Sequence, residues 1–192
     1  EHGVITFRNV EGVKKGKYGK DGDRSFCVYL DGYDRRGNEF EDPDKIPQYK
    51  YGSEWMNPND LIPALERDNW IISWTKQSED GEYPARPYLK VNVKFRESEK
   101  ARAFNPKVWL AKRNEELVPV DEASIKNLDT IWIKDAKIRI RPYNYEEERD
   151  GIENGKISAQ LKDLCIIPVE DENEEDDDFY TGYRRASEEA PF

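Results

Sequence analysis

The chain of 192 residues has room for one domain of ordinary size plus appendages, because globular domains cluster near ~100–150 residues. Charged residues make up 38% of it and apolar residues 36%, yet its 12% of aromatic residues exceeds what disordered chains contain. This composition predicts a small folded core with charged loops. No apolar run approaches the ~20 residues that cross a bilayer, and the first residues do not resemble a signal peptide, so we expect a cytoplasmic protein.

The net charge of −10 is unevenly distributed along the chain. Residues 169–192 contain ten acidic residues and two arginines, whereas residues 1–168 contain 31 acidic and 29 basic residues. An acidic run without an apolar face cannot form a core, so we expect a disordered tail. The folded domain is therefore predicted to end near Val169.

The predicted elements are mostly strands, because the chain contains several short runs rich in β-branched and aromatic residues with a period of two. In chain order these runs occupy 4–10, 24–30, 70–74, 87–95, 107–111, 131–141 and 156–167. A helix capped by Asn59 or Asp60 is expected to continue through Arg67, and a second short helix to occupy 122–128. Residues 31–57 are predicted to form a long loop or an insertion. The pattern predicts a mainly β domain, a small antiparallel barrel or sandwich with one or two short helices.

The strands divide into an apolar face and a basic, aromatic face. On the strand at 87–95, the outward face predicted by this alternation holds Tyr88, Lys90, Asn92 and Lys94. On the later strands the same division places outward Lys107, Trp109, Lys137, Arg139, Arg141, Tyr143, Ser158, Gln160 and Lys162. This face is either an ordinary solvated sheet surface or a binding surface.

The connection at 12–23 favours binding. It is rich in glycine and carries Lys14, Lys15, Lys17, Tyr18 and Lys20, followed by Arg24. Cations follow the phosphates of a nucleic acid, while aromatic rings stack on unpaired bases at roughly 1–3 kcal/mol per base. The basic loop and the basic, aromatic sheet face together predict a groove for single-stranded nucleic acid.

Two resemblances sharpen this prediction. The ending Glu188-Glu189-Ala190-Pro191-Phe192, after an acidic run that includes Asp176, Asp177 and Asp178, resembles the tail of bacterial single-stranded DNA-binding proteins. Phages encode functional counterparts with acidic tails. In those families the tail recruits replication and repair proteins and competes with DNA for the cationic groove. The resemblance implies that these residues bind partners.

The body is similar to a family of phage-encoded OB-fold single-stranded DNA-binding proteins. The motifs that carry this similarity are GKDGDRSFCV at 19–28, DNW at 68–70, IRIRPYNY at 138–145 and GKISAQLK at 155–162. The chain departs from that pattern in the insertion at 31–57 and in a longer acidic turn at 146–154. The resemblance implies an OB fold over residues 1–168, followed by an acidic partner-binding tail at 169–192.

Enzyme chemistry is not expected. Cys27 and Cys165 lie in separate apolar runs and are predicted to be core thiols, and the only histidine is His2, so neither a zinc cluster nor a histidine-based triad is predicted. Asp129, Asp135 and Asp163 could serve a metal-dependent nuclease, but no tight acidic motif brings them together. We therefore expect no catalytic residues, no metal and no cofactor.

The sequence predicts a non-catalytic, largely sequence-independent single-stranded DNA-binding protein of a phage replication or recombination system. Its predicted DNA contacts are Lys14, Lys15, Lys17, Tyr18, Lys20, Arg24, Tyr88, Lys90, Lys94, Trp109, Lys137, Arg139, Arg141, Tyr143 and Lys162. Its predicted partner contacts are Asp176, Asp177, Asp178, Glu188, Glu189, Pro191 and Phe192. The main alternative is a protein-binding adaptor that does not touch DNA. A mimic of DNA is disfavoured because the negative charge is concentrated in the tail.

Overall fold

The structure is a computed structural model. It describes residues 5–13, 22–34, 36–78, 84–112, 116–144 and 155–169, apart from the side chains of Asp44 and Asn144. No helix within these ranges is long and apolar enough to span a membrane.

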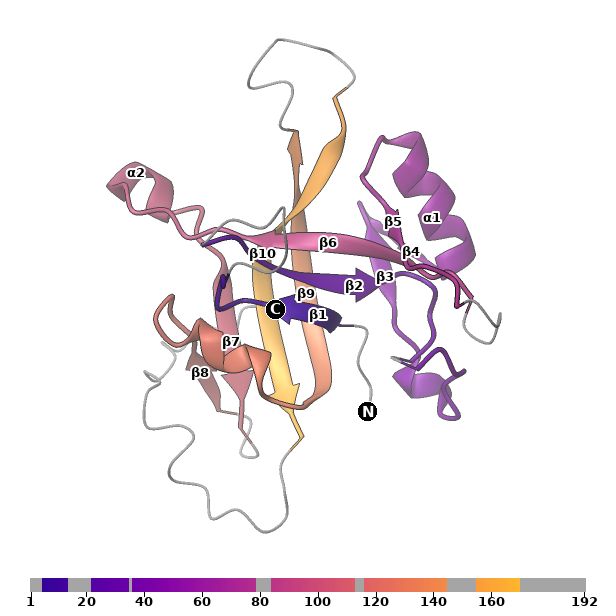
Figure 1. The fold of residues 1–192 in the computed structure, drawn as a ribbon, viewed down its shortest axis with the longest axis horizontal. Helices are drawn as coiled ribbons and strands as arrows, with labels where there is room; N and C mark the ends of the chain where they lie inside the picture. The colour runs from indigo at the N-terminus through magenta and orange to yellow at the C-terminus, as the bar shows by residue number, and fades with distance from the viewer. Residues whose placement is uncertain are drawn as a thin grey trace.

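Among the described residues, eight strands form one sheet (Figure 1). Its main path runs in the order β1 (Ile5–Asn9), β2 (Arg24–Tyr29), β6 (Pro87–Val93), β10 (Ile157–Pro168), β7 (Lys107–Ala111) and β8 (Leu117–Pro119). In addition, β5 (Ser73–Trp74) pairs with β6, and β9 (Ile133–Asn144) pairs with β10. The prediction of a mainly β domain is confirmed.

The sequence predicts an antiparallel sheet, but the observed sheet contains parallel pairings as well. β10 runs parallel to both β6 and β7, whereas its pairing with β9 is antiparallel. β6 meets β10 at Ala159 and Gln160, and β7 meets it at 163–166, so these two strands follow one another along the same edge. Between them lies a connection that carries the short helix α2 (Glu99–Arg102), which was not predicted. Periodicity identifies a strand but contains no information about its partner, which explains the error.

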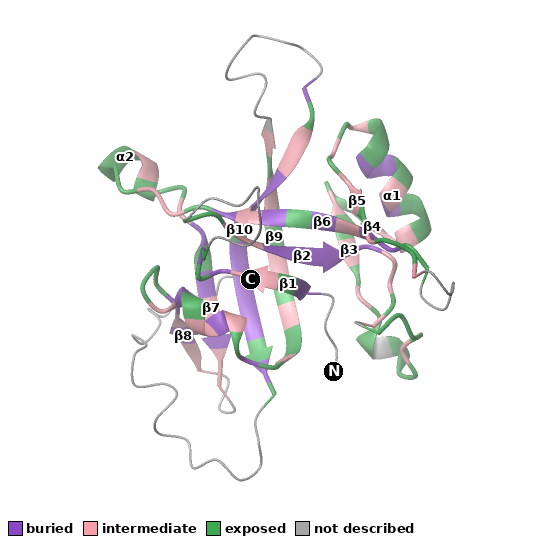
Figure 2. Cartoon of the chain, viewed as in Figure 1, coloured by how far each residue is buried: buried purple, intermediate pink, exposed green. Residues whose placement is uncertain are grey.

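The sheet curls into a half-barrel, with β1, β2 and β6 crossing in front of β9 and β10 in Figure 1. Figure 2 shows that most of β2 and β10 is buried, whereas buried residues alternate with more exposed ones along β6 and β7. On β6, Leu89, Val91 and Val93 are buried, as the alternation predicted, and Pro87 is buried as well. The core beneath the sheet contains Ile5, Val10, Phe26, Val28, Val108, Leu110, Leu161, Leu164 and Ile166. Burial of this apolar surface is the main source of the stability of the fold.

A short 3₁₀ helix, η2 (Ile125–Asp129), ties β1 to the segment before β9. The Asp129 carboxylate accepts hydrogen bonds from the backbone N–H groups of Val10 and Glu11, at 3.0 and 2.9 Å. Arg8 donates to the carbonyl oxygens of Leu128 and Ile131, the latter at 2.7 Å. A short helix was predicted at 122–128, slightly before the observed element.

The insertion at 31–57 is folded, contrary to the predicted long loop. It contains a 3₁₀ turn, η1 (Pro43–Lys45), and a hairpin of β3 (Tyr49–Tyr51) and β4 (Glu54–Met56). Tyr49, Tyr51 and Met56 pack against a second buried cluster that includes Leu61 and Leu65 of helix α1 (Pro58–Arg67). The apolar residues of so short a hairpin are too few for a period to be recognised, and the packing against α1 is a tertiary effect.

Helix α1 begins two or three residues earlier than predicted. Its cap is Asn57, whose side chain accepts a hydrogen bond from the backbone N–H of Asp60 at 3.0 Å. Pro58 then occupies the first helical position, where its missing N–H is not needed. At the other end of the helix, the Tyr51 hydroxyl donates to Asp68 at 2.6 Å and accepts from the Trp70 indole at 3.1 Å. The predicted strand at 70–74 is reduced to β5, and Trp70 forms an isolated bridge with Ile157.

Candidate nucleic-acid interface

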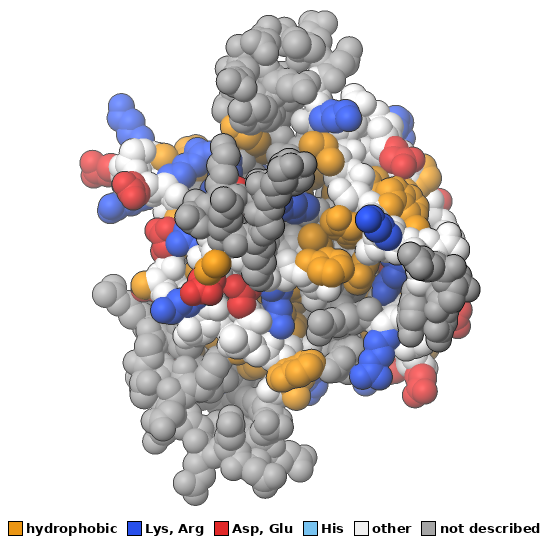
Figure 3. Space-filling model, in the orientation of Figure 1, with side chains coloured by type: hydrophobic (Ala, Val, Ile, Leu, Met, Phe, Trp, Pro, Cys, Tyr) orange, Lys and Arg blue, Asp and Glu red, His pale blue; other side chains and the backbone are white. Residues whose placement is uncertain are grey.

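The outward side of β6 carries the predicted alternation of basic, polar and aromatic side chains. Lys90 and Lys94 are exposed, and Tyr88 and Asn92 are half-buried. The neighbouring strand β2 places Tyr29 opposite Tyr88 and Cys27 opposite Lys90. In Figure 3, apolar and basic side chains lie next to one another over β2 and β6. We call this side of the sheet the outer face.

A group of cations and aromatic rings gathers where β6 leaves the sheet. The Lys94 ammonium lies 5.4 Å from the centre of the Tyr143 ring. The guanidinium groups of Arg96 and Arg141 lie 5.9 and 5.8 Å from the centre of the Phe104 ring. We call these five residues the Phe104 cluster. Three separate segments supply them: the end of β6, the connection after α2, and β9.

The connection between β6 and β7 holds its part of the cluster through Asn105. The Asn105 side chain accepts a hydrogen bond from the backbone N–H of Arg96 at 2.7 Å and donates to the Arg96 carbonyl oxygen at 3.3 Å. The Arg141 guanidinium donates to the Phe104 carbonyl oxygen at 2.8 Å, which links β9 to the same connection. The Phe104 ring nevertheless stays 54% exposed. The backbone is therefore fixed while the ring is accessible.

The two arginines of the cluster repel one another. Partial burial and the nearby positive charge of Arg96 lower the pKa of Arg141 from its usual value, although the group remains charged at neutral pH. An anion bound between the two guanidinium groups would remove this repulsion and could accept hydrogen bonds from both. The cluster thus has the charge of a phosphate site and the exposed ring of a stacking site.

Arg139 is different, because it has a carboxylate partner. Its guanidinium lies 2.6 Å from the Asp163 carboxylate, whose side chain is only 4% exposed. Asp163 faces outward on β10, opposite Arg139 in the strand pairing, so Arg139 neutralises a buried charge on the outer face. Gln160, which was expected to be exposed, is also buried.

The remaining predicted contacts on this side lie farther along β7, β9 and β10. Lys137 and Trp109 are both paired with Cys165, so they share the outer face, where Lys137 is exposed and Trp109 half-buried. Lys162 is exposed at a shift in register between Leu161 and Asp163. Cys27 and Cys165 are buried and form no disulfide, as predicted. Burial raises the pKa of Cys27 to about 11, against a smaller opposing effect of Lys90.

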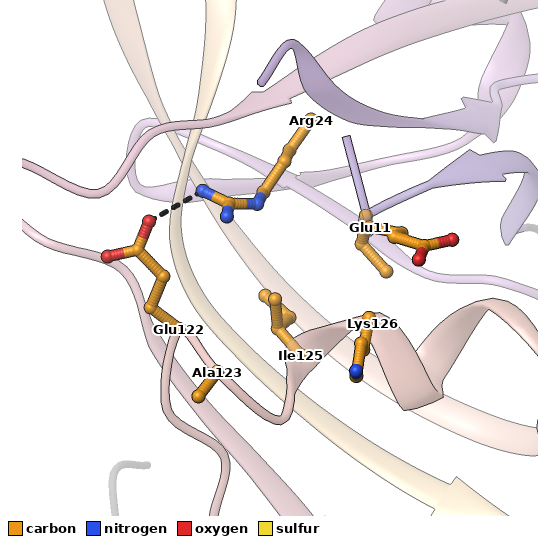
Figure 4. A pocket seen from close by; sticks show the side chains of 7 residues that line it. Glu11, Arg24, Glu122, Ala123, Ile125 and Lys126 are labelled. Carbon is orange, nitrogen blue, oxygen red and sulfur yellow. Dashed lines mark hydrogen bonds and ion pairs between the residues drawn. The ribbon is translucent and has the colours of Figure 1, made fainter. Parts of the chain in front are cut away.

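Arg24 lies apart from the other predicted contacts. It is paired with Val93, on the side of β2 that carries Phe26 and Val28, and its guanidinium lies 2.7 Å from Glu122. This ion pair borders a pocket of about 440 Å³ (Figure 4). The residues that line the pocket are Val10, Glu11, Arg24, Glu122, Ala123, Ile125 and Lys126. Its charges are mixed, so it offers no concentrated site for an anion.

The predicted contacts Lys14, Lys15, Lys17, Tyr18 and Lys20 lie outside the described residues, as do all those of the tail. The structure adds three residues that the sequence analysis missed. Arg96 and Phe104 lie in the connection between β6 and β7, where no periodicity exists to assign a face. Phe7 is 62% exposed, and its ring lies 6.3 Å from that of Tyr88.

In the described part of the chain, no group of Cys, His, Asp or Glu side chains is close enough together to hold a metal ion. Compared with protein-family models, curated proteins and solved structures, the chain matches none.

Proposed function

We propose that the protein binds single-stranded DNA, without catalysis and largely without sequence preference, along the outer face of β6 and over the Phe104 cluster. The cluster is the observation that carries this proposal. It combines three cations with two aromatic rings within one small surface, and among the described residues no carboxylate forms an ion pair with Arg96 or Arg141 as Asp163 does with Arg139. This combination is what a backbone phosphate and an unpaired base require.

An exposed ring favours single strands over duplex DNA, because the bases of a duplex already stack on one another. Lys90, Lys94, Arg96 and Arg141 would contact phosphates, whereas Tyr88, Phe104 and Tyr143 would contact bases. Lys137, Lys162 and Trp109 would extend the surface along β7, β9 and β10. Arg24 and Arg139 would contribute less, since each already has an acidic partner.

The sequence resemblance supports a more specific form of this proposal. The curled, mainly β sheet is compatible with a small barrel, and we propose that it is an OB fold of the phage-encoded family. The basic loop that contains Tyr18 would then hold the DNA against the sheet. The acidic tail, through Pro191 and Phe192, would recruit replication or recombination proteins in the host cytoplasm.

The test is a titration of the intrinsic tryptophan fluorescence of the full chain with oligo-dT, duplex DNA and RNA of equal length. We expect oligo-dT to bind more tightly than duplex DNA. We also expect the affinity to fall with salt, with a log–log slope of about −0.7 for each phosphate neutralised. Failure to bind any single-stranded oligonucleotide at low salt would refute the proposal.

One observation favours the alternative, an adaptor that binds only proteins. Trp55 on the β3–β4 hairpin is 66% exposed with Lys50 over its ring, and Trp74 of β5 is 53% exposed. Exposed tryptophans are frequent anchors of protein interfaces. An adaptor would show partner binding that depends on Trp55 and no response to oligo-dT.

A further inference from the structure

Phe7 occupies an unusual position in β1. The pairing with β2 joins Thr6 to Cys27 and Asn9 to Ser25, so Phe7 and Arg8 together oppose the single residue Phe26. This is a β-bulge, in which one strand has an extra residue. Phe7 has a φ of +47°, in the left-handed region that favours glycine.

The bulge itself has a structural explanation, but the phenylalanine does not. The extra residue turns the Arg8 side chain toward η2, where its guanidinium binds the carbonyl oxygens of Leu128 and Ile131. A glycine at position 7 would allow the same turn without strain, because bulges of this type commonly have glycine in the left-handed conformation. The protein instead keeps a large aromatic side chain where the backbone disfavours one.

Packing does not account for the ring either. Phe7 is 62% exposed, so most of its surface is in contact with water. Its ring lies 6.3 Å from that of Tyr88 at an angle of 54°, beside the outward residues of β6. Strained residues that persist without a packing benefit are typical of binding sites.

We infer that Phe7, together with Tyr88, stacks on a base of the same DNA strand that crosses the Phe104 cluster. This inference rests on the proposed function. It implies that the bound DNA follows the length of β6, from Phe7 and Tyr88 to the Phe104 cluster. Tyr88 of β6 and Lys94, the residue directly after β6, are six positions apart, or about 20 Å at ~3.3 Å per residue. Lys90 lies between them on the same face and is exposed, so it would contact the DNA backbone. A length of about 20 Å corresponds to about six nucleotides at the ~3.4 Å spacing of a B-form strand, and to fewer if the strand is stretched.

The test compares Phe7→Gly and Phe7→Tyr with the wild-type full chain in oligo-dT binding and in thermal unfolding. We expect Phe7→Gly to weaken binding by about 5- to 150-fold, the range for the loss of one stacked base. The salt slope should not change, because a ring neutralises no phosphate. The melting temperature should stay the same or rise, since glycine removes the strain. Phe7→Tyr should bind like the wild type, because it keeps the ring.

Trp55→Ala is the matched control, since Trp55 is equally exposed on a strand outside the sheet that contains β6. It should leave the affinity unchanged. The inference is overturned if Phe7→Gly binds as tightly as the wild type, or if it loses several degrees of thermal stability, which would show that the ring supports the fold. A wild-type chain that does not bind oligo-dT would instead refute the proposed function, so the two failures are distinguishable.

Discussion

An arginine lies over an aromatic ring both at Tyr29 and at Phe104, but the two places differ in the charge that faces the arginine. Arg86 lies 3.8 Å from the centre of the Tyr29 ring and makes two hydrogen bonds to the Asp31 carboxylate, at 2.6 and 2.9 Å. Burial disfavours its charge, but the hydrogen bonds and negative charge of Asp31 outweigh this effect and raise the pKa of Arg86. In the Phe104 cluster, Arg141 faces Arg96 and its pKa is lowered.

This difference in charge distinguishes the Arg86 site, which is structural, from the Phe104 cluster, which is a candidate binding site with the same residue types. The Arg86 pair is complete, and it joins the start of the insertion to the residue just before β6. The Phe104 cluster has an excess of positive charge and an exposed ring, so a ligand with a phosphate and a base would complete it. Residue type alone therefore does not separate the two kinds of site, whereas the charge that faces the arginine does.

The largest expected effect is the loss of stability caused by Arg86→Met. It leaves the Asp31 carboxylate without its partner in a site where both side chains are at most 14% exposed. Breaking a buried ion pair in this way costs about 3–5 kcal/mol of the free energy of unfolding. Urea denaturation would measure the loss. Arg67→Met is the control, because it removes an exposed arginine from its pair with Asp68 and should change stability little. Equal losses in the two variants would show that Arg86 is not a structural anchor.

A second variant tests whether the Phe104 cluster binds DNA. Phe104→Ala removes the exposed ring that two arginines approach, and it should weaken oligo-dT binding by about 1–3 kcal/mol with little change in stability. Trp132→Ala is matched in exposure, at 58% against 54%, and lies outside the cluster. We expect it to bind DNA normally in a fluorescence anisotropy titration. If both variants lose affinity equally, stacking is not localised at the cluster.

Arg139 and Lys137 allow the same distinction to be tested on the outer face. Arg139→Ala should cost about 1–3 kcal/mol of stability, because the buried Asp163 carboxylate loses its partner. Its effect on the salt slope of DNA binding should be small. Lys137→Ala should do the opposite, flattening the slope by about 0.7 without loss of stability. A flatter slope in Arg139→Ala with unchanged stability would assign Arg139 to the DNA.

The smallest expected effect concerns pH. The folded chain holds the Cys27 thiol at a pKa of about 11, above its ordinary value of 9.0, so the unfolded chain loses this proton first. Stability that comes from the protonated thiol is complete below pH 9 and declines as the pH rises toward 11. Cys27→Ala should therefore lose less stability between pH 8 and about pH 11 than the wild type, as measured by urea denaturation. An identical pH dependence of the two proteins would contradict this.

Local patterns predicted β6 and its two faces because alternation is strong there: Leu89 and Val91 are buried, while Lys90 and Lys94 are exposed. They did not predict the parallel pairing of β10, since pairing joins segments far apart in the chain. Nor could they place Phe104, whose position depends on the hydrogen bonds of Asn105 to Arg96. Arg24 and Arg139 were grouped with the other cations because the sequence does not show that Glu122 and Asp163 face them.

The most direct test of the central claim is the salt dependence of oligo-dT binding by the wild type and by the double variant Arg96→Gln/Arg141→Gln. If the cluster binds two phosphates, the double variant should bind more weakly, and its log–log slope should be flatter by about 1.4. The control Lys45→Gln/Arg67→Gln removes two exposed cations outside the cluster and should keep the wild-type slope. If the wild type and Arg96→Gln/Arg141→Gln show the same slope and affinity, the Phe104 cluster is not the DNA-binding site.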